Sequence, residues 1–306
     1  MSAKYFQVAQ GVWGLKQYFV NVYMIANRRS AGKGWVLVDT GIKGSEKDII
    51  AAAEKLFGPG TRPAAIVLTH GHADHSGSVK ELLKHWNVPV YAHKLEIPYL
   101  TGLSSYPPAD PGVGGGLMTL LSWMWPVKPI NISRNLREID IYEGIPELPE
   151  WKVIHTPGHT PGHISLFLPL NTTLIAGDAF TTTIAESATY LFGNIKHISG
   201  PPKYITTDWK AAEQSVHELA ELQPRIAATG HGPVMRGREL ITALNQLSRD
   251  FETVALPQSG RYVRRAAIAD ERGVRYVPPV KVGAKQTIGF AAAASVAAFL
   301  LVRSLW

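Results

Sequence analysis

The chain has 306 residues, of which 45% are hydrophobic, and this supplies enough apolar surface for one large domain or two small ones. It contains no cysteine, which excludes disulfides, thiolate metal ligands and cysteine nucleophiles, so any bound metal must be held by nitrogen and oxygen. The formal net charge is +7, but between Arg261 and Lys285 seven basic residues stand against two acidic ones, which leaves a nearly neutral body without the broad basic surface of a nucleic-acid-binding protein.

The first part of the chain predicts strands with a helix behind them. Residues 19–26 and 34–41 are rich in β-branched and aromatic side chains and are bounded by turn formers, which is typical of strands. A helix is expected at 46–57, with Ser45 and Asp48 as a capping box. The N-terminus has no basic region followed by an apolar run, so we expect no secretory signal and a cytoplasmic location.

The next elements alternate between strand and helix. The short apolar run AAIVLTH at 64–70 is typical of a buried strand and delivers His70 at its carboxyl end. A helix at 78–86 and a strand at 88–93 follow, as in a layered α/β protein.

Residues 96–136 interrupt this alternation. A turn-rich piece, YPPADPGVGGG, is followed by an apolar piece, LMTLLSWMWPVKP. Two interpretations stay open: an insertion that forms a lid over a site, with the apolar residues at 103–126, or a core helix with a long lead-in.

The second half repeats the mixture of strands and helices. We expect strands at 151–156, 163–170, 172–178 and 225–232, a helix within 207–223 capped by Thr207 or Asp208, and an amphipathic helix at about 238–256. Two β-rich halves that separate near residue 140 are compatible with a sandwich of two sheets.

The composition changes from Arg261 onward. A stretch typical of a linker leads to residues 287–302, which carry no charge but fall short of the roughly 20 residues that a bilayer span prefers. This segment is either a C-terminal helix that packs on the body or a membrane-associated tail. The basic flank at 261–285 favours contact with anionic lipid at the inner face of the membrane.

One short motif carries the chemistry. His70, His72, Asp74 and His75 leave the end of a predicted strand in the run HGHADH, where a turn allows side chains to converge. Four groups so close in sequence cannot all surround one ion without strain, so a second ion or further ligands are needed. Other predicted strands end in the same way, at Asp178 and His231, and a turn between strands carries His159. We expect the neighbouring His155 and His163 to bond to the backbone instead.

With these residues the sequence resembles the metallo-β-lactamase superfamily over roughly residues 10–255. Five motifs match in order: Asp39 in VDTG, H-x-H-x-D-H at 70–75, His159, Asp178 and His231. The resemblance implies an αββα sandwich with the site at one edge, between the sheets. The catalytic domain would span 1–258, with the insert or lid at about 96–136, and a basic C-terminal extension would occupy 259–306.

The resemblance also implies a ligand set. His70, His72 and His159 would hold one metal ion, Asp74, His75 and His231 the second, Asp178 would bridge them, and Asp39 would support the ligands without being one. Two zinc ions are expected, because nitrogen and oxygen ligands without sulfur suit zinc and hydrolysis needs no redox activity. A hydroxide formed between the ions would be the nucleophile, and Asp74 would orient it. The alternative cofactor is a single Fe²⁺, as in persulfide dioxygenases.

Family patterns narrow the reaction without naming the substrate. We expect a hydrolase of the glyoxalase II or lactonase-like branch that cleaves a lactone, carboxylic ester or thioester of an apolar small molecule. Trp123, Trp125 and Tyr190 are candidate pocket residues; acyl-homoserine lactonases carry a tyrosine three residues after the bridging aspartate, where this chain has Thr181. A persulfide dioxygenase, a β-lactamase-type amide hydrolase and a non-catalytic binding module stay open as alternatives.

Overall fold

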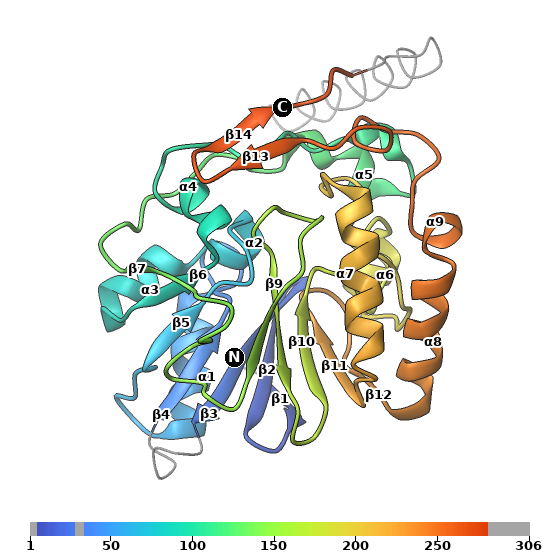
Figure 1. Ribbon diagram of the computed structural model, residues 1–306. Coiled ribbons are helices and arrows are strands. Elements are labelled where there is room, and N and C mark those ends of the chain that lie inside the picture. The colour runs from blue at the N-terminus through green and yellow to red at the C-terminus, as the bar shows by residue number, and fades with distance from the viewer. Residues whose placement is uncertain (1–4, 28–33, 281–306) are drawn as a thin grey trace, which may run out of the picture.

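Two β-sheets lie face to face, and helices cover the outer face of each (Figure 1). The computed structural model describes residues 5–27 and 34–280. The first sheet contains, in spatial order, β1 (Tyr5–Ala9), β2 (Val12–Gln17), β3 (Val20–Asn27), β4 (Gly34–Val38), β5 (Ala65–Val67), β6 (Val90–Ala92) and β7 (Leu136–Glu138). The second contains β12 (Met235–Arg236), β11 (Ile226–Thr229), β10 (Thr173–Gly177), β9 (Ile164–Leu168) and β8 (Lys152–His155).

The helices belong to one sheet or the other. On the first sheet lie α1 (Glu46–Phe57) and α3 (Val79–Trp86), and on the second lie α7 (Trp209–Glu221), α8 (Gly237–Arg249) and α9 (Phe251–Val254). Short helices fill the connections: α2 (Ala73–Ser76), η2 (Lys94–Glu96), α4 (Ile97–Leu100), η3 (Pro111–Val113), α5 (Leu117–Leu120), η4 (Ser122–Met124) and α6 (Ala188–Gly193). A hairpin of β13 (Ile268–Asp270) and β14 (Gly273–Tyr276) lies at one end of the sheets (Figure 1).

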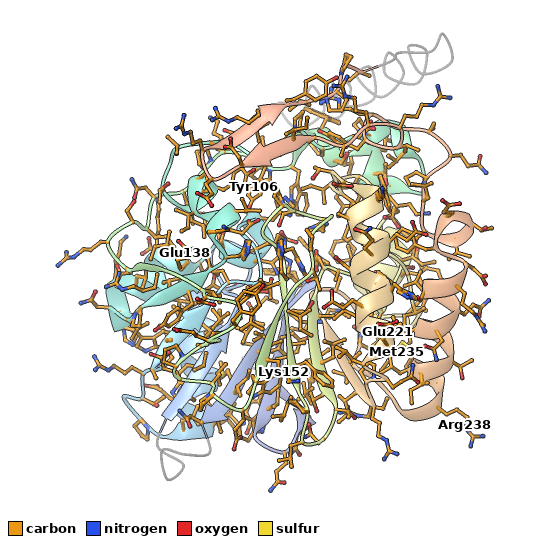
Figure 2. All side chains as sticks on the ribbon, viewed as in Figure 1. Tyr106, Glu138, Lys152, Glu221, Met235 and Arg238 are labelled. Atoms are coloured by element: carbon orange, nitrogen blue, oxygen red, sulfur yellow. The ribbon has the colours of Figure 1, made fainter. Side chains whose placement is uncertain are left out.

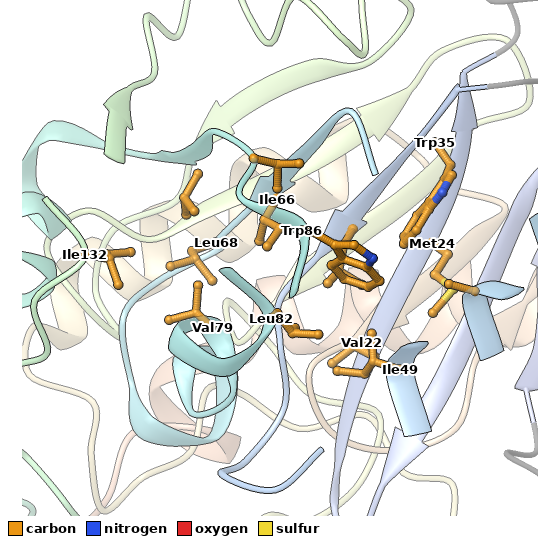
Figure 3. Close-up of a cluster of buried hydrophobic side chains, with 14 of the residues drawn as sticks. Val22, Met24, Trp35, Ile49, Ile66, Leu68, Val79, Leu82, Trp86 and Ile132 are labelled. Carbon is orange, nitrogen blue, oxygen red and sulfur yellow. The ribbon is translucent and has the colours of Figure 1, made fainter. Parts of the chain in front are cut away.

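The alternation of side chains along the strands produces these layers. In β3, Val22 and Met24 pack in a cluster with the buried faces of α1 and α3, which Figure 3 shows. The intervening Tyr23 and Ile25 point the opposite way, into a second cluster that also holds Leu166 of β9. A third cluster joins the outer face of the second sheet to α7 and α8. Three apolar layers between four layers of elements make an αββα sandwich, as the sequence predicts.

Several expected elements are confirmed and some local details differ. Helix α1 has the expected bounds, but Ser45 has helical dihedral angles and its side chain makes no capping hydrogen bond. Asp208, not Thr207, caps α7, because its Oδ1 accepts the backbone N–H of Ala211 at 3.1 Å. The helix expected at 238–256 is divided at Asp250 into α8 and α9.

The stretch from residue 259 to 280 is in contact with the body. The Tyr262 hydroxyl donates to the Pro108 carbonyl at 2.6 Å, and the backbone N–H of Val274 donates to Ser104 Oγ at 3.1 Å. This part of the expected linker is therefore folded against residues 104–113. The apolar segment expected at 287–302 lies outside the described residues. Within residues 5–27 and 34–280, no helix is long and apolar enough to cross a bilayer.

The topology brings the chemistry-bearing residues to one end of the sheets. Strands β4, β5 and β6 are parallel, as are β10 and β11, so the carboxyl ends of each set lie at the same edge. The chain leaves β5 toward α2, leaves β10 at Asp178, and leaves β11 toward His231. Residues that are far apart in sequence therefore meet between the two sheets.

We expect the cluster under α1 and α3 to carry a large share of the stability. Leu82 of α3 is fully buried there. The change Leu82→Ala should lower the free energy of unfolding by about 2–5 kcal/mol, because it removes apolar contacts and leaves a cavity. Urea denaturation at matched metal content measures this. The control Leu170→Ala, at a side chain that is 72% exposed, should change the value by less than about 0.5 kcal/mol; equal losses in the two variants would contradict the assignment.

Candidate metal centre

All seven residues expected to hold metal lie together at the end of the sheets. The turn from β5 into α2 supplies four of them, the turn between β8 and β9 one, and the residues after β10 and β11 one each; they are His70, His72, Asp74, His75, His159, Asp178 and His231. Each is at most 4% exposed. Removing so many titratable side chains from water costs free energy, and proteins bury them together only where opposite charges, hydrogen bonds or bound metal ions compensate for this loss.

The ligand-type atoms form three overlapping groups, and the atoms of each group lie within 4.8 Å of one another. Two of the groups share no residue: the first is His70, His72 and His159, and the second is Asp74, His75 and His231. A third group, His70, His75 and Asp178, takes one histidine from each of these two. Asp178 lies between the two groups. Its Oδ2 is 3.5 Å from His159 Nε2 of the first group and 3.2 Å from His231 Nε2 of the second.

Buried atoms without partners test whether a metal fits. His70 Nε2, His75 Nε2 and Asp178 Oδ1 are buried and have no hydrogen-bond partner among the described residues. A buried polar atom without a partner costs about 1–3 kcal/mol, so three in one cluster indicate that a further group belongs there. Imidazole nitrogens and carboxylate oxygens are ligands for divalent metal ions, and the residues present fit such ions.

In four of the five imidazoles, contacts to Nδ1 on the far side of the ring leave Nε2 facing the cluster; in His72, Nδ1 itself faces the cluster and lies 3.0 Å from His159 Nε2. His75 Nδ1 lies 2.8 Å from Asp39 Oδ2, and His231 Nδ1 lies 2.9 Å from the carbonyl oxygen of Phe19. Thr69 and Thr206 hydroxyls contact the Nδ1 atoms of His70 and His159, at 3.1 and 3.3 Å respectively. Such contacts fix the ring orientation and the tautomer of a metal ligand.

Asp39 holds the first turn in two places. Besides contacting His75, its carboxylate accepts the backbone N–H and the hydroxyl of Thr69, each at 2.8 Å. Asp39 itself has a φ of 61°, a left-handed conformation that aspartate adopts more readily than most residues. The structure thus places Asp39 in contact with His75 and with Thr69, the residue before His70.

Glu96 is a positioning residue that the sequence analysis does not identify. It is fully buried, and its carboxylate accepts the backbone N–H groups of Gly71 and Gly162, both at 2.9 Å, and the Thr160 hydroxyl at 2.7 Å. It also accepts the hydroxyl of Tyr106. Glu96 therefore ties the turn that carries His70–His75 to the turn that carries His159. Burial raises the pKa of Glu96, while the hydrogen bonds oppose this shift.

Tyr106 packs directly on a ligand residue. Its ring centroid lies 4.5 Å from that of His72, and Figure 2 shows Tyr106 at the end of the sheets where the β13–β14 hairpin lies. Figure 2 places Lys152 and Met235 toward the opposite end. Glu96 escapes sequence analysis because nothing in the run HKLEIPYL distinguishes a buried glutamate from an ordinary residue at a helix start.

Burial and charge divide the histidines into two kinds. Burial lowers the pKa of His70 and of His159 well below the usual value, so both are neutral and able to ligate at neutral pH. Burial acts on His231 in the same direction, but the carboxylates of Asp178 and Asp74 outweigh it and raise the pKa to about 10. Without metal, a proton on His231 offsets the buried carboxylates.

A narrow cleft opens onto the cluster. Five ligand-type residues and four other side chains form its walls; the lining residues are His72, Asp74, Trp125, His159, Asp178, Pro202, Tyr204, Ile205 and His231. Of the expected pocket residues, Trp125 lines this cleft. Trp123 is 60% exposed and is not among the lining residues, and the Tyr190 ring lies 6.1 Å from that of His197.

The other histidines of the HTPGHTPGH run lie behind the cluster. His163 Nε2 accepts the backbone N–H of Asp178 at 2.8 Å, and its Nδ1 lies 2.8 Å from the Thr156 hydroxyl. His155 Nε2 lies 2.8 Å from the Pro161 carbonyl oxygen, and its ring stacks on that of His93. Both side chains contact the backbone, as the sequence analysis expects.

Comparisons with known proteins agree with this arrangement. The sequence profile described as the Metallo-beta-lactamase superfamily matches residues 15–231. The "Probable metallo-hydrolase YflN" of Bacillus subtilis (strain 168) is 41% identical over 249 residues, which cover 81% of this chain and 94% of that protein. A hydroxyacylglutathione hydrolase of Alkalilimnicola ehrlichii is 35% identical over 120 residues, covering 39% of this chain and 34% of that enzyme.

Solved structures show the same fold. A beta-lactamase domain protein from Burkholderia ambifaria superposes with a TM-score of 0.58 at 18% identity, covering 82% of this chain and 77% of that one. The αββα sandwich and the buried cluster of histidines and aspartates at one edge agree with this family. This chain belongs to the metallo-β-lactamase superfamily and is a metal-dependent hydrolase of that fold.

We expect the support from Asp39 to be measurable as metal affinity. The change Asp39→Asn removes the negative charge behind His75 and should weaken metal binding by about 10-fold to 100-fold. Competition with a chromophoric chelator measures the dissociation constant. Asp110→Asn is the matched control, because Asp110 is a buried aspartate that accepts the backbone N–H of Gly112 away from the cluster. Affinities that fall equally in both variants would contradict the role given to Asp39.

Metal binding should release protons. Because the pKa of His231 is raised to about 10, this residue holds a proton at pH 7 that an incoming ion must displace. Affinity should therefore rise with pH between 6 and 9, by about tenfold per pH unit for each proton displaced. Calorimetric zinc titrations in two buffers of different ionisation enthalpy count the released protons. An affinity independent of pH over this range would show that the metal-free site is not protonated.

Proposed function

We propose that this enzyme is a binuclear zinc hydrolase that cleaves an ester-like bond in a lactone, carboxylic ester or thioester. The observation that carries the proposal is that the cluster holds two ligand groups that share no residue, with Asp178 between them. His70, His72 and His159 would hold one ion, Asp74, His75 and His231 the other, and Asp178 would contact both. When bound, zinc supplies Lewis acidity and activates water at neutral pH.

Asp74 is the residue best placed to orient the attacking water. It lines the cleft, and its Oδ2 lies 3.3 Å from His231 Nε2 and 3.6 Å from His75 Nε2. Burial alone would raise the pKa of Asp74, but His75 and His231 lower it below the usual value. The carboxylate therefore stays ionised and accepts hydrogen bonds, which suits a group that holds water in one orientation.

Tyr204 is our candidate for holding the substrate carbonyl group. Its side chain is 4% exposed and lines the cleft, and its hydroxyl makes no hydrogen bond within the part of the chain that the structure describes. Burial raises the pKa of Tyr204 well above the usual value, so the hydroxyl keeps its proton and can donate it in a hydrogen bond. Thr181 cannot take this role, because it is fully buried and its hydroxyl donates to the Thr183 carbonyl at 2.7 Å.

The lining of the cleft favours a substrate with an apolar group next to the proposed metal ligands. Trp125, Pro202 and Ile205 form its apolar wall, and its charged lining residues all belong to the proposed ligand set. The similarity to part of a hydroxyacylglutathione hydrolase supports a thioester among the candidate substrates. A single iron held by two histidines and one aspartate would leave at least four of the seven clustered side chains unused, and this favours two ions over the persulfide dioxygenase alternative.

A panel of soluble substrates tests the proposal. We expect the zinc-loaded enzyme to hydrolyse at least one lactone, p-nitrophenyl ester or acyl thioester, and to lose this activity when a chelator removes zinc. Tyr204→Phe should lower kcat by about 100-fold, because it removes one hydrogen-bond donor from the reacting carbonyl. Tyr142→Phe, at a side chain that is 93% exposed, is the matched control. Hydrolysis of a β-lactam alone, or oxygen consumption with a persulfide, would refute the proposed reaction.

A further inference from the structure

The segment that runs from α5 through η4 buries polar side chains and exposes apolar ones. Thr119 and Ser122 are 1% exposed, and both hydroxyl oxygens lack a hydrogen-bond partner among the described residues. The large apolar side chains of the same segment point outward and are 38–60% exposed: Leu117, Leu120, Leu121, Trp123 and Met124, which we call the α5–η4 rim. Exposed apolar side chains gathered in this way mark a surface that contacts another apolar phase.

The α5–η4 rim continues into the mouth of the metal site. Trp125, the next residue, lines the cleft, and the Phe19 ring lies 5.8 Å from it. Phe19 also lies 6.0 Å from the ring of Phe192, which is 56% exposed on α6. The backbone N–H of Met118 in α5 donates to the carbonyl oxygen of Glu186 at 3.1 Å. This hydrogen bond holds α5 next to the residues that precede α6. Apolar surface therefore extends along the entrance to the cleft.

Positive charge accompanies this surface. From residue 111 to residue 133 the sequence has no acidic residue and one basic residue, Lys128. The basic segment that starts at Arg261 lies against the turn that leads into α5, because the Ser259 hydroxyl donates to the Gly112 carbonyl at 3.1 Å. Figure 1 shows α5 and the β13–β14 hairpin at the same end of the molecule. Arg264 and Arg272 are exposed there.

The sequence beyond the described residues starts from this end as well. Strand β14 ends at Tyr276, and the description ends at residue 280, near the α5–η4 rim end of the molecule (Figure 1). The next 26 residues include the run 287–302, which carries no charge and is flanked by Lys281, Lys285 and Arg303. Apolar sequence with basic flanks is typical of chain that contacts anionic lipid.

We infer that the α5–η4 rim is a docking surface for an anionic lipid bilayer, with the mouth of the metal site facing the membrane. The apolar side chains would enter the headgroup region, and Arg264, Arg272 and their basic neighbours would contact lipid phosphates. A second copy of this chain fits the rim less well, because pairing two rims would bring two basic ends together. The inference concerns binding and does not depend on which bond the enzyme cleaves.

Vesicle sedimentation with the full chain tests this surface. We expect binding to vesicles of phosphatidylcholine with phosphatidylglycerol, little binding to phosphatidylcholine alone, and weaker binding at high salt. Leu120→Asp with Met124→Asp should lower the partition coefficient by about tenfold or more, because two apolar side chains no longer enter the lipid. Arg264→Gln with Arg272→Gln should lower it by about fivefold for each arginine.

Controls show whether a loss of vesicle binding comes from the α5–η4 rim itself. Leu170→Asp introduces one aspartate, against two in the rim variant, at an exposed leucine in the turn between β9 and β10, and should bind vesicles like the unchanged chain. Metal content should stay the same in all variants, which shows that the fold and the metal site are intact. Failure of the unchanged chain to bind, or an equal loss in Leu170→Asp, would overturn the inference.

Two further outcomes point to other surfaces. If Phe299→Asp with Leu301→Asp abolishes binding while the α5–η4 rim variant binds normally, the C-terminal segment alone contacts lipid and the inference is wrong. If the unchanged chain self-associates in sedimentation velocity runs, binds no vesicles, and becomes monomeric in the rim variant, the surface is an interface between copies. Hydrolysis of a soluble ester is measured separately, so failure of the docking surface and failure of the proposed reaction are distinguishable.

Discussion

The burial of two carboxylates among five histidines is the constraint on which the rest of this structure depends. Asp74 and Asp178 are almost inaccessible to water, and the nearby His75 and His231 hold their pKa values below the usual range. Such a group of charges is stable in a protein interior only if opposite charges sit beside it. Protons on the histidines can supply that positive charge, but His75 Nε2 and Asp178 Oδ1 then still have no hydrogen-bond partner. Divalent cations would both balance the carboxylate charge and bind these two atoms.

The surrounding fold keeps these ligands in place through contacts between distant parts of the chain. Asp39 ends one strand and fixes the His75 ring, while the buried Glu96 joins the two turns that supply His70 and His159. Loops alone would position such a site loosely, because loops are the mobile parts of most proteins. Here hydrogen bonds to backbone N–H groups connect them to each other and to the ends of buried strands.

Sequence predicts the parts of this protein that depend on local pattern. The bounds of α1, the buried β5 run and the order of ligand-type residues at strand ends all follow from short patterns, and the structure agrees with each. Glu96 could not be predicted, because its partners Gly71 and Gly162 are 25 and 66 residues away. The exposed leucines of α5 break the rule that apolar residues face the core, so the run LMTLLSWMW favoured a core helix or a lid equally.

The metal content of the purified chain tests the central claim most directly. Elemental analysis of the unchanged protein and of His231→Ala, with the exposed His217→Ala as control, counts the ions that the two ligand groups hold. The account predicts close to two zinc ions per chain, a loss of about one in His231→Ala, and no change in the control. One iron per chain, unaffected by His231→Ala, would contradict it.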